Sequence, residues 1–364
     1  MSRLPYSVLA ETAAGVGLDV FGVISSANLE RELERHFNHL QKWQGDGHAG
    51  EMHYMRRSWE IFAELDRFLP NVRSVVAFSV SYYSPHEISL PGRKVPPAPP
   101  GFGRVARYAW GRDYHKVLRH RFSLLCAELK KFGFASVAHR EFSDAVPLLE
   151  RAIASAVSLG FVGKNCMLIR PGAGSFSFLG EILLDIEVEL PPLTPPIKSR
   201  CGNCQRCLDM CPTQAFVQPM ILDARKCISY LTIEKRGAFS SWEQRAIGSW
   251  LFGCDVCQEV CPHNHSGISI SKCPEFQPDQ GVGPYLSLSE ILRIRTDEEF
   301  YRKFSGTPLT RAKREGLLRN ACAVAANTDC QELVPELEEV AKLNSSNMLG
   351  EQAIQAISRL SGSD

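Results

Sequence analysis

The spacing of the cysteines restricts this chain more than any other feature of its sequence. Eight of its thirteen cysteines fall between positions 201 and 261, in two runs that mirror each other. The first run is Cys201-x-x-Cys204-x-x-Cys207-x-x-x-Cys211-Pro212, the second is Cys254-x-x-Cys257-x-x-x-Cys261-Pro262, and Cys227 lies between them. This pattern is typical of chains that fold around two 4Fe–4S clusters. The sequence therefore predicts an electron-transferring protein.

The same spacing predicts which cysteines bind each cluster. Two-residue gaps let a tight loop place three sulfurs around one cluster, and the cysteine just before proline reaches the other cluster. The first cluster would take Cys201, Cys204, Cys207 and Cys261, and the second would take Cys211, Cys227, Cys254 and Cys257. Cys273 competes with Cys227 for the last place, but it lies beyond the closing Cys-Pro pair.

Zinc and disulfide bonds are the alternatives for these cysteines. Zinc sites use paired cysteines but do not need three at these gaps followed by proline. Disulfides need an oxidising compartment, and the sequence shows no secretion signal. The cysteines outside the motif are expected to pack as small apolar residues, and these are Cys126, Cys166, Cys273, Cys322 and Cys330.

Composition limits the class of protein. The 364 residues suffice for two or three domains, and 44% hydrophobic with 22% charged residues is ordinary for a globular chain. The formal net charge of +1 does not indicate a polyanion partner, although a local basic patch still could. The longest apolar stretch, residues 152–163, is too short to cross a bilayer. We expect a cytoplasmic protein that does not engage a membrane.

Three parts follow from the position of the cysteines: residues 1–195, 196–275 and 276–364. The first part reads as mixed α/β, with apolar strands at 74–82 and 181–190. An amphipathic helix is predicted over 113–132, with apolar residues every three or four positions and Gly133 as its stop, and a second helix is predicted over 147–159. The proline-rich segments 91–101 and 191–196 read as a surface loop and a stiff linker.

The last part repeats itself weakly. Ala323, Val324 and Ala326 correspond to Ala353, Ile354 and Ala356 at an offset of 30, and a helix is predicted between them over 333–343. This pattern favours α-helical repeats of HEAT type. A plain helical cap on the preceding domain is the alternative.

Six segments outside the cluster ligands carry a resemblance to a known family. They are Gly50-x-Met52-x-Tyr54-Met55, 106–115 (ARYAWGRDYH), 143–151 (SDAVPLLER), 159–165 (LGFVGKN), 227–232 (CISYLT) and 253–258 (GCDVCQ). In this order, from about residue 4 to the C-terminus, they closely resemble the epoxyqueuosine reductases, cobalamin-dependent enzymes that make the last step to queuosine in tRNA.

The resemblance implies a fold and an activity. The fold would be an α/β cobalamin-binding domain like that of reductive dehalogenases, a two-cluster ferredoxin module and a C-terminal α-helical HEAT-like domain. The activity would be reduction of epoxyqueuosine, at the wobble position of a tRNA anticodon, with two electrons and two protons. Electrons would come from a low-potential donor of flavodoxin or ferredoxin type and pass through the clusters to cobalamin. Nothing in the sequence demands more than a monomer.

Asp144 holds the position of the family's proton donor. To donate at neutral pH it would need a raised pKa, which burial against an apolar corrin face would favour. From the residues alone, the alternative is a helix cap, since Ser143 and Asp144 are both good cap residues ahead of Pro147.

Other contacts carry over from the family with packing or turn roles as their alternatives. The cobalamin contacts implied are Arg57, Leu168, Leu179, Ser229 and Asp255, with Asp144 facing the same cofactor, and Lys235 matches a tRNA-contacting position. Arg57 is the weakest of these because the alignment around it needs a length change.

The chain departs from the family at two segments. Ala106 stands where some members have a cysteine, so a cysteine contact to the cofactor at that point cannot be general. Residues 157–161 read VSLGF in place of the common AGLGW. Asp46-Gly47-His48-Ala49-Gly50 falls one residue short of the Asp-x-His-x-x-Gly pattern by which histidine ligates cobalt, and we interpret it as a glycine-rich turn.

A basic segment near the C-terminus is a candidate for phosphate contacts. It contains one acidic residue, Glu315, and six basic residues: Arg302, Lys303, Arg311, Lys313, Arg314 and Arg319. Residues 104–121 are also rich in basic side chains. The alternative is a set of solvated helix faces, which is what most charge runs are.

Two other functions remain to be weighed. A reductive dehalogenase-like enzyme acting on a small molecule is opposed by the helical repeats, the basic segment and the lack of a twin-arginine leader. A non-catalytic electron carrier is opposed by the long segment before the clusters and by an acid at the proton-donor position.

Overall fold

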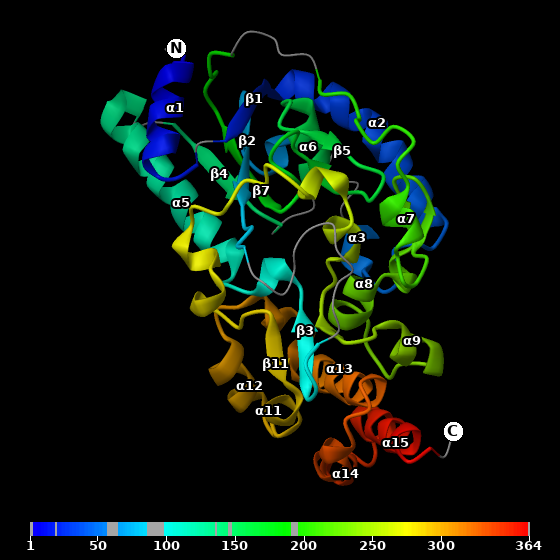
Figure 1. The fold of residues 1–364 in the computed structure, drawn as a ribbon. Helices are drawn as coiled ribbons and strands as arrows, with labels where there is room; N and C mark the ends of the chain where they lie inside the picture. The colour runs from blue at the N-terminus through cyan, green and yellow to red at the C-terminus, as the bar shows by residue number, and fades with distance from the viewer. Residues whose placement is uncertain are drawn as a thin grey trace.

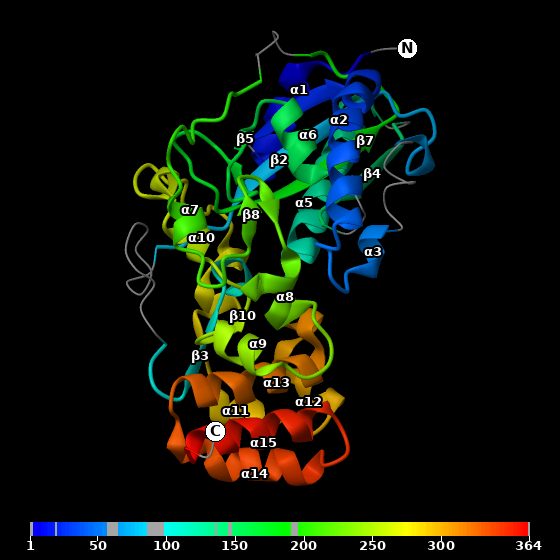
Figure 2. The same cartoon turned by 90° about the vertical axis from the view of Figure 1, so that its right-hand side faces the viewer.

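The computed structural model describes residues 3–18, 20–56, 65–85, 98–134, 137–144, 148–190 and 196–362. Arg57, residues 91–97 of the predicted loop and residues 191–195 of the predicted linker lie outside these ranges. Figures 1 and 2 show an α/β layer at one end of the molecule and helices at the other, with the cysteine segment along one side between them.

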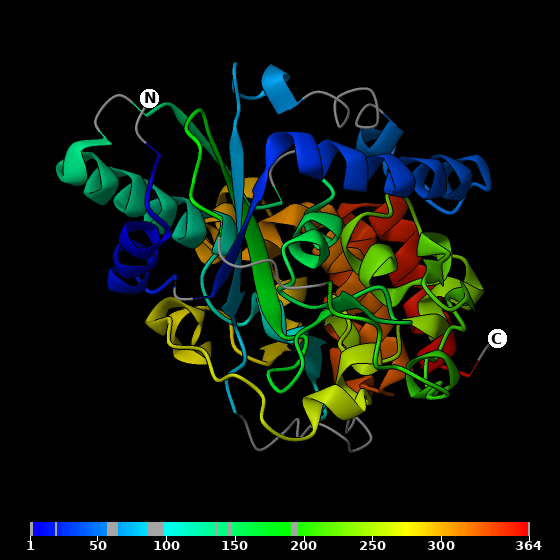
Figure 3. The same ribbon diagram turned by 90° about the horizontal axis from the view of Figure 1, so that it is seen from above.

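The α/β layer is built on an antiparallel sheet in the order β1-β2-β7-β4. Its strands are β1 (Phe21–Ser25), β2 (Ser74–Ser81), β7 (Ser177–Leu184) and β4 (His139–Phe142). Side chains alternate between the two faces along a strand, so each face has its own core. Val76 and Phe78 face the helices α1 (Tyr6–Gly15) and α5 (Tyr114–Leu129). Val75 and Ala77 face the helices α2 (Ser26–Gly45) and α6 (Glu150–Ala156) on the opposite side (Figure 3).

The predicted elements of this layer are present, with shifted ends. The strand predicted at 74–82 is β2, and the one predicted at 181–190 is β7, which begins at Ser177 and ends at Leu184. The helix predicted over 113–132 is α5, with Asp113 as its N-cap; a π-helical turn follows it, in which Gly133 has a φ of 91°. The apolar spacing predicted up to residue 132 includes Phe132, but this residue lies beyond α5 and is exposed, so that end of the predicted apolar face was wrong. The helix predicted over 147–159 is α6, which is shorter at both ends.

A second, smaller sheet joins segments that are far apart in the sequence. Its order is β10-β3-β11, from β10 (Trp250–Phe252), β3 (Phe102–Val105) and β11 (Tyr285–Ser287). Val105, Ala106 and Trp110 consequently pack in the same core as the C-terminal helices. A boundary at residue 195 therefore does not separate the hydrophobic cores, because the chain contributes β3 to the other end of the molecule.

Short elements surround the cysteines. They are α7 (Arg206–Asp209), α8 (Ile228–Ile233), α9 (Ser241–Ala246) and α10 (Val256–Glu259), with the hairpin β8 (Phe216–Gln218) and β9 (Ile221–Leu222). The helices α7 and α10, one from each cysteine run, contact each other. Three further elements border this region: α3 (His53–Arg56), β5 (Phe161–Val162) and β6 (Leu168–Ile169).

The C-terminal end is a stack of helices (Figure 2). They are α11 (Leu288–Leu292), α12 (Asp297–Phe304), α13 (Lys313–Asn327), α14 (Val334–Leu343) and α15 (Met348–Leu360). The two segments with matching alanines lie on α13 and α15, which pack together, and α14 packs on α15. Within the described residues, no helix is both long and apolar enough to pass through a membrane.

Candidate functional site

The structure gathers the motif cysteines into two groups. Burial, followed by the neighbouring thiolates of Cys261, Cys201 and Cys204, raises the pKa of Cys207 to about 11. Burial likewise raises the pKa of Cys257, and here the neighbouring thiolates are first Cys254, Cys227 and Cys211. These two groups of four are the sets that the spacing predicts. A cluster or metal that favours thiolates would offset the cost of ionising them.

The alternatives for the cysteines find no support in the geometry. All thirteen cysteines are free thiols. Among the described residues, no three His, Cys, Asp or Glu side chains are close enough to hold a single metal ion. Four thiolates on a cubane bind four different irons and therefore stand further apart. Cys273 is 2% exposed and packs in the core beside α5, which contains none of the eight motif cysteines.

Cys227 occupies the N-cap position of α8. Burial raises the pKa of its thiol, while the backbone N–H groups of Tyr230 and Ser229 lower it by pointing at the sulfur. Free N–H groups at the start of a helix stabilise a thiolate. Ser229 thus lies directly beside this sulfur, as the sequence suggested.

Asp255, next to Cys254, is held inside the protein. Its carboxylate accepts a hydrogen bond from the Arg107 N–H at 2.6 Å and is 3% exposed. Burial, followed by the charge of the nearby Glu259 carboxylate, raises the pKa of Asp255 to about 6. Arg107 donates to Glu259 at 3.1 Å and lies over the ring of Trp110 at 4.4 Å. The Arg-x-x-Trp segment therefore anchors the second cysteine run.

Asp144 lies at the start of α5 in space, although thirty residues separate them. The Tyr114 hydroxyl donates to its Oδ2 at 2.7 Å, and His115 Nε2 lies 3.7 Å from the same oxygen. The other ring nitrogen of His115 is 2.8 Å from Asp113, the N-cap of the helix. The Asp144 carboxylate itself is 69% exposed, so it faces open space with its polar partners behind it.

Two neighbouring side chains set the charge state of this group. Desolvation favours a higher pKa for Asp144, but the hydrogen bonds from His115 and Tyr114 and the charge of His115 outweigh it, and the pKa is lowered. Burial lowers the pKa of His115, but its bonds to Asp113 and Asp144 raise it to about 9. The sequence did not reveal these two partners, and the raised pKa of Asp144 against a corrin face stays a prediction. At neutral pH the proton is on His115.

Tyrosines connect Asp144 with the cysteine side. Burial raises the pKa of Tyr108 well above its ordinary value, and the next contributions come from Asp144 and Asp255. Tyr108 is therefore near both carboxylates. Tyr54 is 48% exposed, and its ring carries the guanidinium of Arg311 at 5.3 Å from the centroid. Burial raises the pKa of Tyr54 to about 12.

Leu168 lies on β6 and Leu179 lies on β7. Leu168 is 6% exposed, and the carbonyl of Leu179 accepts the Ser143 hydroxyl at 2.9 Å. His48 lies in a turn between two glycines with positive φ, and its Nδ1 is 3.7 Å from Asp223 Oδ2.

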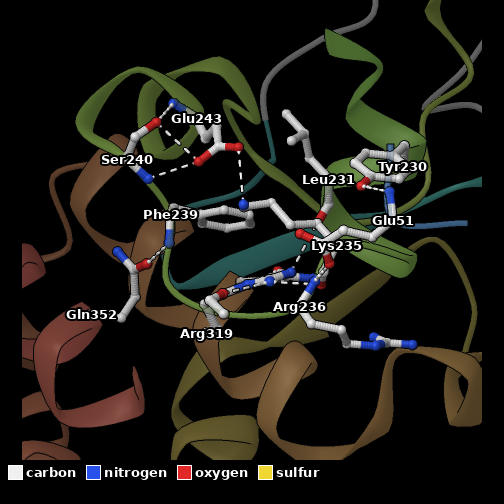
Figure 4. Close-up of polar contacts among 12 residues, drawn as sticks. Glu51, Tyr230, Leu231, Lys235, Arg236, Phe239, Ser240, Glu243, Arg319 and Gln352 are labelled. Carbon is white, nitrogen blue, oxygen red and sulfur yellow. Dashed lines mark hydrogen bonds and ion pairs between the residues drawn. The ribbon is translucent and has the colours of Figure 1, made fainter. Parts of the chain in front are cut away.

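Lys235 follows α8 and is engaged within the protein (Figure 4). Its Nζ lies 3.3 Å from Glu243, which also forms a capping box with Ser240 at the start of α9. Arg319 supports the same loop from below: it donates to the carbonyls of Lys235 and Gly237, and its guanidinium lies 3.9 Å from the centre of the Phe239 ring. To bind a phosphate, Lys235 would have to break its ion pair with Glu243.

The predicted basic segment is largely not a free surface. Arg319 is 1% exposed, and burial lowers its pKa to about 9. Arg311 pairs with Glu234, Arg314 with Asp297 and Lys303 with Glu290. Arg302 and Lys313 are the exposed cations that remain of the six. One of the six residues thus supports a loop and three have acidic partners from other segments, and contact of this segment with phosphates stays a prediction.

Sequence reasoning assigned no role to four residues around Asp144. Tyr114 and His115 belong to the segment 106–115, and their position just after a capping aspartate was a usable signal. Glu150 begins α6, and Glu181 lies in β7 with both carboxylate oxygens buried. A glutamate inside an apolar strand pattern was the signal for Glu181.

Comparisons with known proteins agree with one another. A family model described as a 4Fe-4S double cluster binding domain matches residues 200–264, and one described as epoxyqueuosine reductase QueG, DUF1730, matches residues 63–145. The epoxyqueuosine reductase of Pseudomonas aeruginosa is 39% identical over 315 residues, covering 84% of this chain and 82% of the relative. That of Escherichia coli is 35% identical over 298 residues, covering 81% and 75%.

Two solved structures are similar over nearly the whole chain. A crystal structure of epoxyqueuosine reductase with an epoxyqueuosine-modified tRNA stem loop has a TM-score of 0.81 at 30% identity, covering 97% of this chain and 89% of that one. The epoxyqueuosine reductase of Bacillus subtilis, described with its catalytic aspartate loop swung out of the active site, also has a TM-score of 0.81 at 30% identity, covering 97% and 90%.

Proposed function

Because this chain belongs to the epoxyqueuosine reductase family, it reduces epoxyqueuosine to queuosine in tRNA, and we propose that it does so with cobalamin and two 4Fe–4S clusters. The observation that carries the proposal is the joint presence of two four-thiol groups and an exposed carboxylate backed by an imidazolium. Reduction of an epoxide to an alkene takes up two electrons and two protons and releases water. The thiolates would hold the clusters that carry the electrons, and Asp144 with His115 would supply protons.

The residues around Asp144 suit a large, uncharged cofactor. Phenols of Tyr108 and Tyr114 and the backbone near Leu168 and Leu179 offer apolar surface with neutral hydrogen-bonding groups. Ser229 and Asp255 adjoin ligands of the second cysteine group, so they would border the cofactor on the cluster side. When bound, a reduced cobalamin supplies the electrons that break the carbon–oxygen bond. Arg57 stays a predicted contact outside the described residues.

The protein's own task at this site is to hold and deliver a proton. His115 holds this proton at neutral pH, and its Nε2 lies 3.7 Å from Asp144 Oδ2. A substrate and cofactor that cover the exposed carboxylate would remove it from water, which raises the pKa of a carboxyl and draws the proton from His115. Asp144 then donates it to the epoxide oxygen. The Tyr114 hydroxyl keeps the carboxylate oriented throughout.

Several further assignments belong to the same proposal. Residues 1–195 provide the cobalamin-binding part, 196–275 the cluster module and 276–364 a HEAT-like domain. Lys235 contacts the tRNA after leaving Glu243, a low-potential flavodoxin or ferredoxin supplies electrons, and the protein works as a cytoplasmic monomer. The catalytic aspartate loop of the Bacillus subtilis relative is described as swung out of the active site, and we infer that Ser143 and Asp144 can leave the site in the same way.

A conversion assay tests this function. The protein is loaded with iron, sulfide and cobalamin, supplied with a low-potential reductant, and epoxyqueuosine in tRNA is followed by mass spectrometry. Wild type is expected to form queuosine, and Asp144→Asn is expected to keep both cofactors but lose roughly 100-fold or more in kcat. No conversion by fully loaded wild type would reject the proposed chemistry, and a fully active Asp144→Asn would remove Asp144 from it.

A further inference from the structure

A buried carboxyl group lies under Ser143 and Asp144, which we call the Asp144 segment. Glu181 is 0% exposed, and neither of its carboxylate oxygens has a hydrogen-bond partner among the described residues. It sits on β7 opposite Phe142, the last residue of β4, and the chain reaches Asp144 two residues later. A charged carboxylate without a partner in a protein interior is strongly disfavoured. A glutamate at this point of the sheet therefore needs an explanation that packing does not provide.

A second glutamate connects this interior to Asp144. Glu150 is the first residue of α6, and its Oε1 accepts a hydrogen bond from the backbone N–H of Asp144 at 2.5 Å. Asp144 has a φ of 50°, in the left-handed region that residues other than glycine rarely adopt. On the other side, the Ser143 hydroxyl bonds to the carbonyl of Leu179. The unusual backbone of Asp144 is thus held between the sheet and α6.

We propose that Glu150 is the latch that holds the Asp144 segment in the active site, and that the latch stays closed only while the Glu150–Glu181 pair carries protons. Both glutamates are positioning residues, since they act on the substrate only through Asp144. The inference deepens the proposed function, because it rests on Asp144 as the acid. Protonation of the two glutamates would keep Asp144 in the site, and loss of those protons would release it.

The charges facing the latch set its pH dependence. Burial and, next, the Asp144 carboxylate raise the pKa of Glu150, the Asp144 N–H, Arg151 and His115 lower it, and the net result is a pKa of about 8. The pKa of Glu181 is also raised well above its ordinary value. Burial is the largest cause, and the negative charges of Glu150 and Asp144 add to it. Tyr114 reaches this group through its bond to Asp144.

The sign of the effect follows from linkage. If the Asp144 segment leaves, Glu150 loses a neighbouring negative charge and becomes more exposed, so its pKa falls toward the ordinary value near 4.5. The closed position therefore binds the proton more tightly than the open one. Below pH 4.5 Glu150 is protonated in both positions, so pH does not change the free energy of the closed position relative to the open one. As the pH rises further, the closed position becomes less stable relative to the open one, until the effect is complete above about pH 8. The latch should open on the alkaline side.

Hydrogen exchange at the Asp144 amide measures the latch directly. The loaded protein is followed by mass spectrometry of peptides covering residues 140–150, between pH 5.5 and 8.5, with intrinsic exchange rates divided out. Protection in wild type should fall by roughly tenfold or more across this range. Glu150→Gln keeps an acceptor oxygen but cannot ionise, so its protection should not change with pH. Glu150→Ala should be unprotected throughout, and Glu141→Gln, a matched change on β4, should follow wild type.

Two results would overturn the latch: protection in wild type that does not change with pH, or an Asp144 amide as protected in Glu150→Ala as in wild type. If Glu150→Ala does not fold, the flat profile expected of Glu150→Gln decides the matter alone. In turnover, Glu150→Ala should lower kcat with little change in KM for tRNA, and Glu150→Gln should restore it. Because exchange needs no turnover, a correct exchange result with no conversion would reject the proposed function and leave the latch standing.

Discussion

Asp144 owes its behaviour to three side chains that reach it from two helices. Tyr114 and His115 approach its carboxylate from α5, and Glu150 approaches its backbone from α6. The two α5 residues favour the ionised carboxylate and keep the proton one step away, on His115. A helix cap was the alternative for Asp144, but the residue that caps α5 is Asp113, and the N-cap of α6 is Leu149. At this scale, proton storage and proton donation are divided between two residues.

This division predicts an alkaline limit to activity. The pKa of His115 is raised from 6.5 to about 9, so its proton is fully present near neutral pH and is lost as the pH rises through 9. In the Glu150→Gln background, where the latch no longer titrates, we expect kcat to fall above about pH 9, and the added change His115→Gln to lower kcat roughly 100-fold at pH 7.5 and to abolish that limb. His120→Gln, an exposed histidine on the same helix, is the control. An unchanged pH profile in His115→Gln would contradict the role of His115.

Helix α8 shows how one short element serves two purposes. Its N-terminus directs two N–H groups at Cys227, and its C-terminal end leads into the loop that carries Lys235. That loop is held by Arg319 of α13, whose guanidinium donates to the carbonyls of Leu231, Lys235 and Gly237. A lysine at position 319 could not make this fork of bonds. The C-terminal helices therefore shape the surface next to the cluster segment.

The position of Cys227 on α8 predicts the outcome of a matched pair of substitutions. Cys227→Ala should lower bound iron from about eight to about four atoms per chain, because the second cluster loses one of four ligands. Cys273→Ala should leave the iron content unchanged, since that thiol is buried among apolar side chains of the α/β core. Iron and sulfide analysis with electron paramagnetic resonance gives the measurement. The reverse pattern would assign the eighth ligand to Cys273.

At the scale of the whole molecule, the α/β end and the helical end are joined by a strand that crosses from one to the other, in addition to the linker. Strand β3, which comes from the first third of the sequence, pairs with β10 and β11 at the helical end. Gly253 has a φ of 70°, and a Cβ added to it would lie 2.5 Å from the Ala106 Cβ, so these two segments are packed backbone to side chain. The small Ala106 that departs from the family pattern lies at this contact and is 0% exposed.

Charge is also a property of the whole molecule, and it predicts shallow salt dependence of tRNA binding. The net charge is +1, and most cations of the basic segment are paired or buried. Contact with one to four phosphates gives a slope of about −0.7 to −3 in log K against log salt. Fluorescence anisotropy with a labelled anticodon stem loop measures it. Arg302→Gln with Lys313→Gln should flatten the slope, and Lys342→Gln on α14 should not. A slope steeper than about −5 would require a larger basic surface than we describe.

The sequence by itself determined the class of redox centre, the family and the main elements of the α/β layer. These depend on local spacing: thiolates at short intervals, two-residue alternation in β2 and three-to-four-residue periodicity in α5. Only the tertiary structure decided that Arg319 is buried, that the basic segment is mostly paired, and that β3 crosses to the other end. It also decided the direction of the Asp144 pKa shift, because that shift depends on His115, Tyr114 and Arg311, whose proximity no local pattern encodes. Charge and burial are set by non-local neighbours, which a one-dimensional pattern does not identify.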